Sequence, residues 1–191
     1  MINIDINNGW RRPKFGLLRA SKLYSWLSDE GSLSARIQRH FDNFNLRRVR
    51  QEPACAHPDE WELLRVRPRT QVIVREVILR DGDTSLIYAH TVVARDAERR
   101  AWRALRKLGS RPLAQLLFND KTITPNALQF RHLNTAHPLM AKIRATLPAL
   151  TRSLASQRYW ARRRVFERDG QRLIVTEVFL HAITEGKYHA E

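Results

Sequence analysis

Two pairs of segments rich in Val and Ile, in which apolar and polar residues partly alternate, are the clearest pattern in the chain. The segments are 71–79 paired with 86–94, and 160–168 paired with 173–180. Asp81-Gly82 lies inside the first pair and Asp169-Gly170 inside the second. Apolar runs joined by an Asp-Gly turn are typical of β-hairpins. The sequence therefore predicts two antiparallel hairpins.

Apolar residues at helical spacing indicate helices before and between these hairpins. Leu33, Ile37 and Phe41 are spaced so that they share one helix face, and Ser32 is a suitable N-cap. Other expected elements are helices over 17–27, 96–108 and 113–118, a strand over 46–51 and a connection over 52–70. Prolines in that connection predict loops rather than regular structure.

The expected fold class is α+β, with a single antiparallel β-sheet and helices packed on one face. Strands joined by short turns pair antiparallel, and helices then cover the apolar face of the sheet. A chain of 191 residues has the size of one domain. Residues 1–15 show no periodicity and are expected to form a flexible arm, followed by a domain over 16–183 and a tail over 184–191.

The chain is strongly basic, with a formal net charge of +15. Such a charge attracts nucleic acids, anionic membranes and small anions. The excess is almost entirely Arg and is spread from Arg11 to Arg172 rather than gathered in a tail. We therefore expect no nucleic-acid partner and at most a weak association with anionic membranes. The absence of a GxGxxG motif and of a P-loop argues against dinucleotide and nucleoside-triphosphate chemistry.

Cysteine and histidine give no sign of a metal centre. Cys55 is the only cysteine, which excludes an internal disulfide framework and a cysteine-rich zinc site. The seven histidines lack recognised ligand spacing, so the sequence predicts no metal and no cofactor. No apolar stretch approaches the roughly 20 residues of a membrane-spanning helix, and the N-terminal segment lacks the apolar run of a secretory signal. A cytoplasmic location is expected.

Two charged residues fall on apolar strand faces. Alternate residues of a strand share a face, so Arg75 and Glu177 each lie among aliphatic and aromatic neighbours. These neighbours are Ile73, Val77 and Leu79 for Arg75, and Leu173, Val175 and Phe179 for Glu177. Burial of an unpaired charge costs several kcal/mol, so each group needs a partner in the protein, a ligand or a changed protonation state. A structural ion pair and a solvated face are the simpler interpretations, and a closed pocket is the functional one.

In a pocket, Arg75 would bind a substrate carboxylate, because its planar guanidinium suits bidentate recognition. Glu177 would transfer a proton. Burial favours the neutral carboxyl and a nearby cation favours the carboxylate, and the sequence does not decide between them.

Around these residues the sequence resembles the chorismate lyase family, the 4-hydroxybenzoate synthases of bacterial ubiquinone biosynthesis. The matching segments are VREVILRDG at 74–82, AHTVVA at 89–94, LGSRPLAQLLF at 108–118, HPL at 137–139, YWARRRVF at 159–166 and VTEVFLHA at 175–182. They keep the family's order and spacing from about Leu17 to Ala182. No single segment is specific, but the ordered set is.

The resemblance implies an antiparallel sheet with helices, a monomer, and a ligand enclosed beneath two flaps without a cofactor. It implies that Arg75 binds the ring carboxylate and that Glu177 acts as acid or base near the 4-hydroxyl end of the substrate. It also implies that Leu113 offers a backbone amide to the carboxylate and that Leu33 belongs to a flap over the ligand. The product is expected to be held tightly and to leave slowly.

The chain departs from the family pattern at His90 and Ala94, where the family has Arg and Pro. The missing Arg would help to bind the enolpyruvyl carboxylate, and His90 can still donate a hydrogen bond or carry charge. A strand histidine bonded to a neighbour is the other interpretation. Arg162 and Arg163 are candidate substitutes, although a run of arginines more often forms a solvated face.

The expected reaction is the elimination of pyruvate from chorismate, which gives 4-hydroxybenzoate for ubiquinone biosynthesis. Loss of the enolpyruvyl ether with the adjacent ring hydrogen makes the ring aromatic, so the protein mainly holds the dianion, excludes water and assists proton movement.

Alternative functions stay open. Effector domains of bacterial transcription regulators share this fold, but they normally follow a DNA-binding domain, for which the chain before Leu17 is too short. A lyase that forms 3-hydroxybenzoate and an inactive product-binding paralogue would both fit the substitution at His90.

Overall fold

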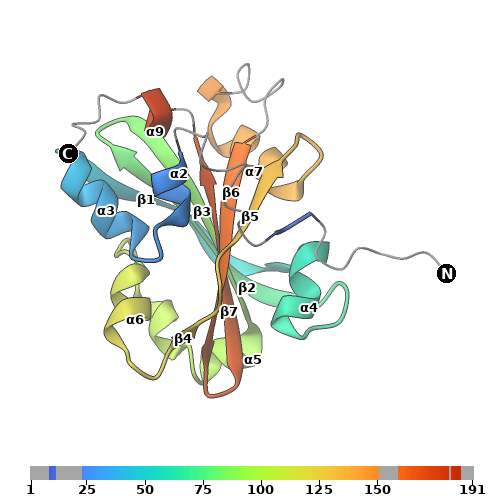
Figure 1. Ribbon diagram of the computed structural model, residues 1–191. Helices are drawn as coiled ribbons and strands as arrows, with labels where there is room; N and C mark the ends of the chain where they lie inside the picture. The colour runs from blue at the N-terminus through green and yellow to red at the C-terminus, as the bar shows by residue number, and fades with distance from the viewer. Residues whose placement is uncertain (1–8, 12–22, 151–158, 181, 186–191) are drawn as a thin grey trace.

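The chain forms an α+β domain around one antiparallel sheet (Figure 1). The computed structural model describes residues 9–11, 23–150, 159–180 and 182–185. In this part of the chain the sheet has seven strands in the order β1-β2-β3-β7-β6-β4, and β5 also pairs with β6. The strands are β1 (Phe44–Cys55), β2 (Gln71–Asp81), β3 (Thr84–Ala94), β4 (Thr124–Pro125), β5 (Gln129–Leu133), β6 (Tyr159–Arg168) and β7 (Gln171–Phe179). The predicted fold class is confirmed.

The two predicted hairpins, β2-β3 and β6-β7, form the middle of the sheet. Asp169 and Gly170 have φ angles of 50° and 70°, as a type I′ turn requires. In the first hairpin Asp81 still pairs with Thr84, so its turn lies one residue later than the Asp-Gly pair. Gly82 takes a φ of 53° there, a conformation that suits glycine.

One face of the sheet is covered by helices from the first and middle parts of the chain. They are α2 (Tyr24–Ser28), α3 (Leu33–His40), α5 (Arg95–Arg99), the 3-10 helix η2 (Arg103–Lys107) and α6 (Ala114–Asn119). α3 begins as predicted, because the Oγ of Ser32 accepts a hydrogen bond from the Ala35 N–H at 3.1 Å. Leu33 and Ile37 of this helix are buried against the sheet.

The structure differs from the expectation in that helices cover both faces of the sheet. Figure 1 shows α2, α3 and α6 on one side and α4 and α7 on the other. The second face carries η1 (Pro58–Glu60), α4 (Trp61–Leu64) and α7 (Pro138–Thr146), while η3 (Pro148–Leu150) contacts α7 and α9 (Ala182–Glu185) contacts β3. The reason is that neighbouring strand residues are apolar on both faces: Val77 and Ala89 belong to one hydrophobic cluster, and Ile78 and Tyr88 to another. Both apolar faces require a cover.

Three expected segments have other boundaries. β1 continues to Cys55, and Pro53 pairs with Ile73, which is tolerated because β1 is an edge strand. The helix expected over 96–108 is broken at Arg100 into α5 and η2. Of the helix expected over 17–27, the part before residue 23 lies outside the described residues.

Part of the predicted N-terminal arm packs against the domain. Trp10 is buried, and its Nε1 donates a hydrogen bond to Asp59 Oδ2 at 2.8 Å. Arg11 forms an antiparallel bridge with Phe130 of β5. Residues 1–8 of the arm and 186–191 of the tail lie outside the described residues.

Candidate active site

A cavity lies between the sheet and the helices of the α2, α3 and α6 side. Its volume of about 70 Å³ is several times the roughly 10–15 Å³ that one water molecule needs, so it suits a small organic molecule. The cavity is lined by, among others, Leu33, Arg75, Ala89, Leu113, Arg162 and Glu177. The cavity is not fully enclosed, because Glu30, Gly31 and Phe118 at its rim are exposed.

Arg75 is a buried cation without an acidic partner among the described residues. The residue is 1% exposed, and its terminal nitrogen donates to the carbonyl oxygens of Gly109 at 3.2 Å and Arg111 at 2.9 Å. Its Nε has no hydrogen-bond partner. Burial and the nearby Arg48 lower the pKa of Arg75 to about 10, so the group stays charged at neutral pH. An unpaired buried guanidinium in a cavity is a site for an anion.

The loop that holds Arg75 also brings Leu113 to the cavity. Gly109 has a φ of 58°, which lets the chain turn after η2 and present two carbonyl groups to the guanidinium. Leu113 follows at the start of α6 and is 8% exposed. Leu113 thus lines the same cavity as Arg75, two residues after the Arg111 carbonyl that accepts a hydrogen bond from the guanidinium.

Glu177 lies at another part of the same cavity. Its side chain is 17% exposed, and its Oε2 accepts a hydrogen bond from the Nε of Arg162 at 2.5 Å. Arg162 is the neighbour of Glu177 in the β6-β7 register, and its side chain is 4% exposed. The acid therefore pairs with Arg162 and not with Arg75, which leaves the charge of Arg75 available to a ligand.

The sheet register sets the distance across the site. Arg75 pairs with Thr91 on β3, which pairs with Val175 on β7, and Glu177 is the next residue on the same face. Two strand spacings and one two-residue step along the strand put the Cα atoms of Arg75 and Glu177 roughly 12 Å apart. The two side chains can therefore contact opposite ends of one small ring.

The turn between α2 and α3 is tied over the cavity by two arginines of β6. Arg162 donates to the carbonyl oxygens of Trp26 at 3.2 Å and Asp29 at 2.6 Å. Arg164 donates to the carbonyl of Glu30 at 2.7 Å. Leu33, the first residue of α3, is buried in the cavity wall directly after this turn. These positions agree with the flap role that the resemblance implied for Leu33.

His90 does not line this cavity. It lies on the opposite face of the sheet, where its ring nitrogens are 3.0 Å from Glu60 Oε1 and 2.9 Å from Glu76 Oε1. Burial opposes its protonation, but Glu60 and Glu76 raise the pKa of His90 to about 9. The expectation that His90 binds the substrate is corrected by this location, because Ala89 and Thr91 are the β3 residues that face the cavity.

The arginines of β6 divide between the two faces. Arg162 and Arg164 line the cavity, whereas Arg163 points to the other face and pairs with Asp59 at 3.2 Å. None of the three is on a solvated face. Sequence reasoning named Arg162 only as a substitute and did not name Arg164. Arg162 and Arg164 are alternate residues of β6, and β6 pairs with the strand that carries Glu177. This alternation is the sequence signal that could have found both arginines.

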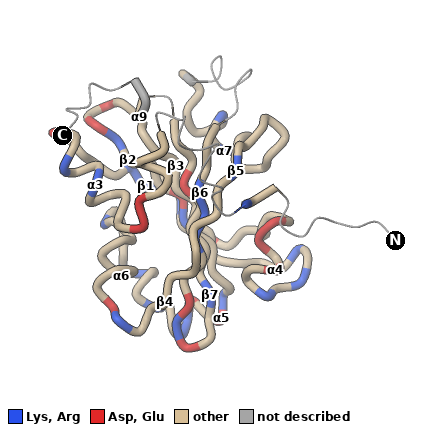
Figure 2. Tube along the Cα trace, in the orientation of Figure 1, with Lys and Arg blue, Asp and Glu red and all other residues tan. Residues whose placement is uncertain are grey.

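The charge of the described residues is spread rather than gathered. Figure 2 shows Lys and Arg on elements of both faces of the sheet. Among the described residues, no helix is long and apolar enough to span a membrane. Fold and cavity together define an α+β domain whose cavity, with a free guanidinium and a paired carboxylate in its wall, suits a small organic anion.

Comparison with known proteins identifies the family to which this domain belongs. The family model described as chorismate lyase matches residues 6–187. A probable chorismate pyruvate-lyase of Cupriavidus metallidurans is 40% identical over 155 residues, which cover 81% of this chain and 71% of that protein. One of Thiobacillus denitrificans is 35% identical over 175 residues, 92% of this chain and 90% of that protein. The chain belongs to the chorismate lyase family, and its match begins ten residues before the predicted domain start at residue 16.

Similarity to solved structures extends to transcription regulators. A GntR-family regulator of Bacillus cereus has a TM-score of 0.53 at 10% identity and covers 78% of this chain and 97% of that chain. The C-terminal domain of the histidine utilization repressor of Pseudomonas syringae has a TM-score of 0.51 at 13% identity, covering 78% and 95%. At these identities the likeness shows the fold alone.

Proposed function

We propose that the protein is a chorismate pyruvate-lyase that releases 4-hydroxybenzoate and pyruvate. Membership of the family supports this function, and one observation in the structure carries it. The buried guanidinium of Arg75 has no acidic partner among the described residues and shares a cavity with Glu177. Chorismate supplies a carboxylate for the first group and, across its ring, the reacting carbon atoms for the second.

Arg75 and the loop beside it orient the substrate. The ring carboxylate binds the free edge of the Arg75 guanidinium, with the backbone at Leu113 next to it. The rest of the ring then extends past Ala89 and Thr91 of β3 toward Glu177. Ala89 leaves room on the cavity floor for a planar ring because its side chain is small.

Glu177 moves the proton in the reaction. The bond between the ring carbon and the ether oxygen breaks, and its electron pair leaves with enolpyruvate. Glu177 accepts the proton from the adjacent ring carbon that bears the hydroxyl group, and the electrons of that C–H bond complete the aromatic ring. Enolpyruvate takes up a proton and becomes pyruvate.

Arg162 positions Glu177 for this step. Its hydrogen bond to Glu177 Oε2 fixes the carboxylate, and its bonds to Trp26 and Asp29 join the same guanidinium to the turn over the cavity. Its charge also favours departure of the anionic enolpyruvate. The elimination itself is driven by aromatisation and needs no redox cofactor.

We further propose that the enzyme acts as a monomer in the cytoplasm. Phe118 at the cavity rim is the exposed large hydrophobic residue of the described chain. A single exposed side chain is no interface for a stable oligomer. The basic surface supports a weak, salt-sensitive association with anionic membranes.

The proposed function is tested by turnover of chorismate. Purified protein should release equal amounts of pyruvate and 4-hydroxybenzoate, and Glu177→Gln should lower kcat by about 100-fold or more because the proton acceptor is lost. Glu167→Gln, in the same hairpin but at its far end, is the matched control and should keep full activity. Binding of 4-hydroxybenzoate without any pyruvate release by the unmodified protein would instead indicate a sensor or a product-binding protein. Formation of 3-hydroxybenzoate would show the alternative lyase.

A further inference from the structure

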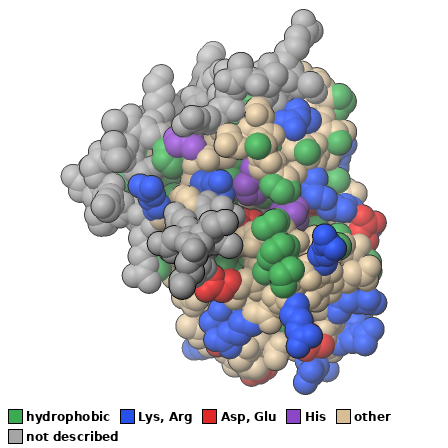
Figure 3. Space-filling view, turned by 90° about the vertical axis from the view of Figure 1, so that its right-hand side faces the viewer, with side chains coloured by type: hydrophobic (Ala, Val, Ile, Leu, Met, Phe, Trp, Pro, Cys, Tyr) green, Lys and Arg blue, Asp and Glu red, His purple; other side chains and the backbone are tan. Residues whose placement is uncertain are grey.

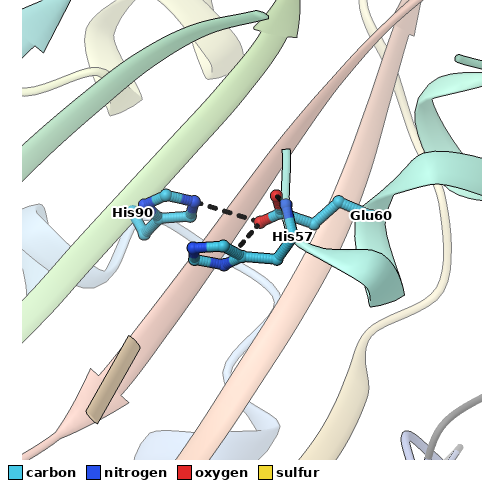
Figure 4. A group of neighbouring side chains, drawn as sticks. All are labelled: His57, Glu60 and His90. Atoms are coloured by element: carbon cyan, nitrogen blue, oxygen red, sulfur yellow. Dashed lines mark hydrogen bonds and ion pairs between the residues drawn. The ribbon is translucent and has the colours of Figure 1, made fainter. Parts of the chain in front are cut away.

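A second group of chemically reactive side chains is buried on the face of the sheet opposite to the cavity. It consists of His57 at the start of η1, Glu60 at its end and His90 on β3 (Figure 4). The three residues are 8%, 2% and 1% exposed. The reaction proposed above uses none of them.

The donor atoms of these residues have the spacing of a metal site. His90 Nε2 is 3.0 Å and His57 Nδ1 is 3.7 Å from the same oxygen, Glu60 Oε1. All three donor atoms lie within 4.8 Å of one another. Ligand atoms around a tetrahedral Zn²⁺ ion, with bonds of about 2.0–2.2 Å, are roughly 3.4 Å apart. The observed separations bracket this value.

The contacts within the cluster are not directed hydrogen bonds. His90 Nε2 and His57 Nδ1 are buried and have no hydrogen-bond partner, although Glu60 Oε1 is close to both. A hydrogen bond needs the N–H to point at the acceptor. A metal ion at this point would therefore break no directed hydrogen bond of the two nitrogens.

Outer contacts hold the ligands in the form that a metal requires. His90 Nδ1 is 2.9 Å from Glu76 Oε1, and Arg50 holds Glu76 through two hydrogen bonds of 2.5 and 3.1 Å. A metal ion bound at Nε2 displaces the proton of that nitrogen, while the Nδ1 proton stays on Glu76. A carboxylate behind a histidine is the usual support of a metal ligand.

Contacts within the cluster also orient Glu60 and His57. Glu60 Oε2 accepts a hydrogen bond from the backbone N–H of His57 at 2.7 Å, so Oε1 is the oxygen that faces the histidines. His57 Nδ1 lies 3.7 Å from the same Oε1, so the carboxylate and both imidazoles converge on one point.

We propose that His57, Glu60 and His90 form a binding site for a first-row divalent metal ion, for which Zn²⁺ fits the two imidazoles and one carboxylate best. The ion joins the η1 segment to β3 and leaves one coordination position for water. The site is structural, because the sheet separates it from the cavity. It is independent of the proposed lyase function.

Occupation requires a small local adjustment. The rings of His57 and His90 are nearly parallel, at 6° with centroids 4.9 Å apart, so the His57 ring turns about its side-chain bonds to aim Nδ1 at the ion. A surface hollow lined by Pro58, Asp59 and His137 lies next to His57. Figure 3 shows histidine side chains at the surface in the middle of this face.

The site is tested by metal titration of untagged protein that has been stripped with a chelator. Isothermal titration with Zn²⁺ should show one ion per chain with a Kd in the micromolar range or tighter. Co²⁺ should give the visible absorption bands of a four-coordinate site. Zn²⁺ at about 100 times the Kd should raise the Tm by about 5–10 °C.

Variants separate this site from incidental metal binding. His57→Ala should weaken Zn²⁺ binding at least about 100-fold, and Glu76→Gln, which weakens the support of His90 without removing a ligand, by about 10–100-fold. The matched controls are His40→Ala, an exposed histidine on α3, and Cys55→Ser, an exposed thiol close to His57 in the chain. Both should bind Zn²⁺ as the unmodified protein does. The absence of 1:1 binding, or unchanged binding by a folded His57→Ala variant, would overturn the proposal.

Discussion

At the scale of single residues, the site depends on how two charges are partnered. Glu177 has its cation in Arg162, whereas Arg75 has only two carbonyl groups. Because Arg162 balances the charge of Glu177 and no acid among the described residues balances that of Arg75, the cavity wall carries a net positive charge. That difference explains how a domain of this size can recognise a dianion with few residues.

Removal of the Arg75 guanidinium should weaken product binding. Arg75→Ala is expected to reduce affinity for 4-hydroxybenzoate by about 10–100-fold, the effect of losing a charge-assisted hydrogen bond. The affinity of Arg75→Lys for 4-hydroxybenzoate should lie between those of Arg75→Ala and the unmodified protein, because an ammonium keeps the charge but not the planar fork. Arg80→Ala, at the end of the same strand, is the control. Unchanged affinity of Arg75→Ala in a direct binding assay would refute the carboxylate assignment.

Residue alternation placed Arg75 and Glu177 on the sheet face that lines the cavity, but it could not place His90. The ladder begins with Asp81 opposite Thr84, and without interruption it would put Arg75 opposite His90 on one face. A bulge between Leu79 and Arg80 shifts the register by one residue, so Arg75 pairs with Thr91. A one-residue shift in register moves every later side chain of a strand to the opposite face of the sheet relative to the partner strand. No sequence pattern predicts this bulge. The sequence therefore could not show that His90 lies on the face of the sheet that carries Glu60.

At the scale of elements, the α2-α3 turn is the part that closes the site. The β6 arginines bind its backbone carbonyls through long side chains, so the turn can separate from the sheet without breaking the sheet itself. Burial lowers the pKa of Arg164, which shows that its charge is partly withdrawn from water. We expect this arrangement to slow the release of a bound product.

Loosening that turn should accelerate product release. Arg164→Ala removes the bond to Glu30 and is expected to raise the dissociation rate of 4-hydroxybenzoate by about tenfold, since one charge-assisted hydrogen bond contributes about 1.5 kcal/mol or more. Stopped-flow displacement measures the rate. Arg172→Ala, on β7 near the far hairpin turn, is the control. If both variants released product at the unmodified rate, the turn would not limit release.

Element boundaries were predictable where local chemistry decides them. Ser32 caps α3 and the Asp169-Gly170 turn closes its hairpin, because both signals act within a few residues. The extension of β1 through Pro53 and the cover of the second face by α4 and α7 depend on contacts between distant segments. His57 and Glu60 likewise meet His90 only through the sheet.

At the scale of the whole molecule, the net charge of +15 remains to be assigned a role. Several arginines are used internally, as Arg75, Arg162 and Arg163 are buried. Lys and Arg lie along elements on both sides of the sheet (Figure 2). Such a field raises the encounter rate with an anionic substrate without creating a specific partner surface.

The charge should produce only salt-sensitive binding to anionic surfaces. Sedimentation with vesicles rich in phosphatidylserine is expected to show binding at low salt that disappears near 0.15 M salt, roughly where the Debye length falls to about 8 Å. Neutral phosphatidylcholine vesicles are the control. Binding that persists at high salt would indicate a dedicated membrane contact. A lack of binding at low salt would show that the protein does not associate with anionic membranes.

The central claim is that Arg75 and Glu177 hold one small aromatic molecule from opposite ends of the same cavity. A crystal structure of the protein with 4-hydroxybenzoate tests it most directly. The account predicts that the carboxylate lies within hydrogen-bond distance of the Arg75 guanidinium, with the hydroxyl end toward Glu177 and Arg162. A molecule bound in the reverse orientation, or on the His90 face of the sheet, would contradict it.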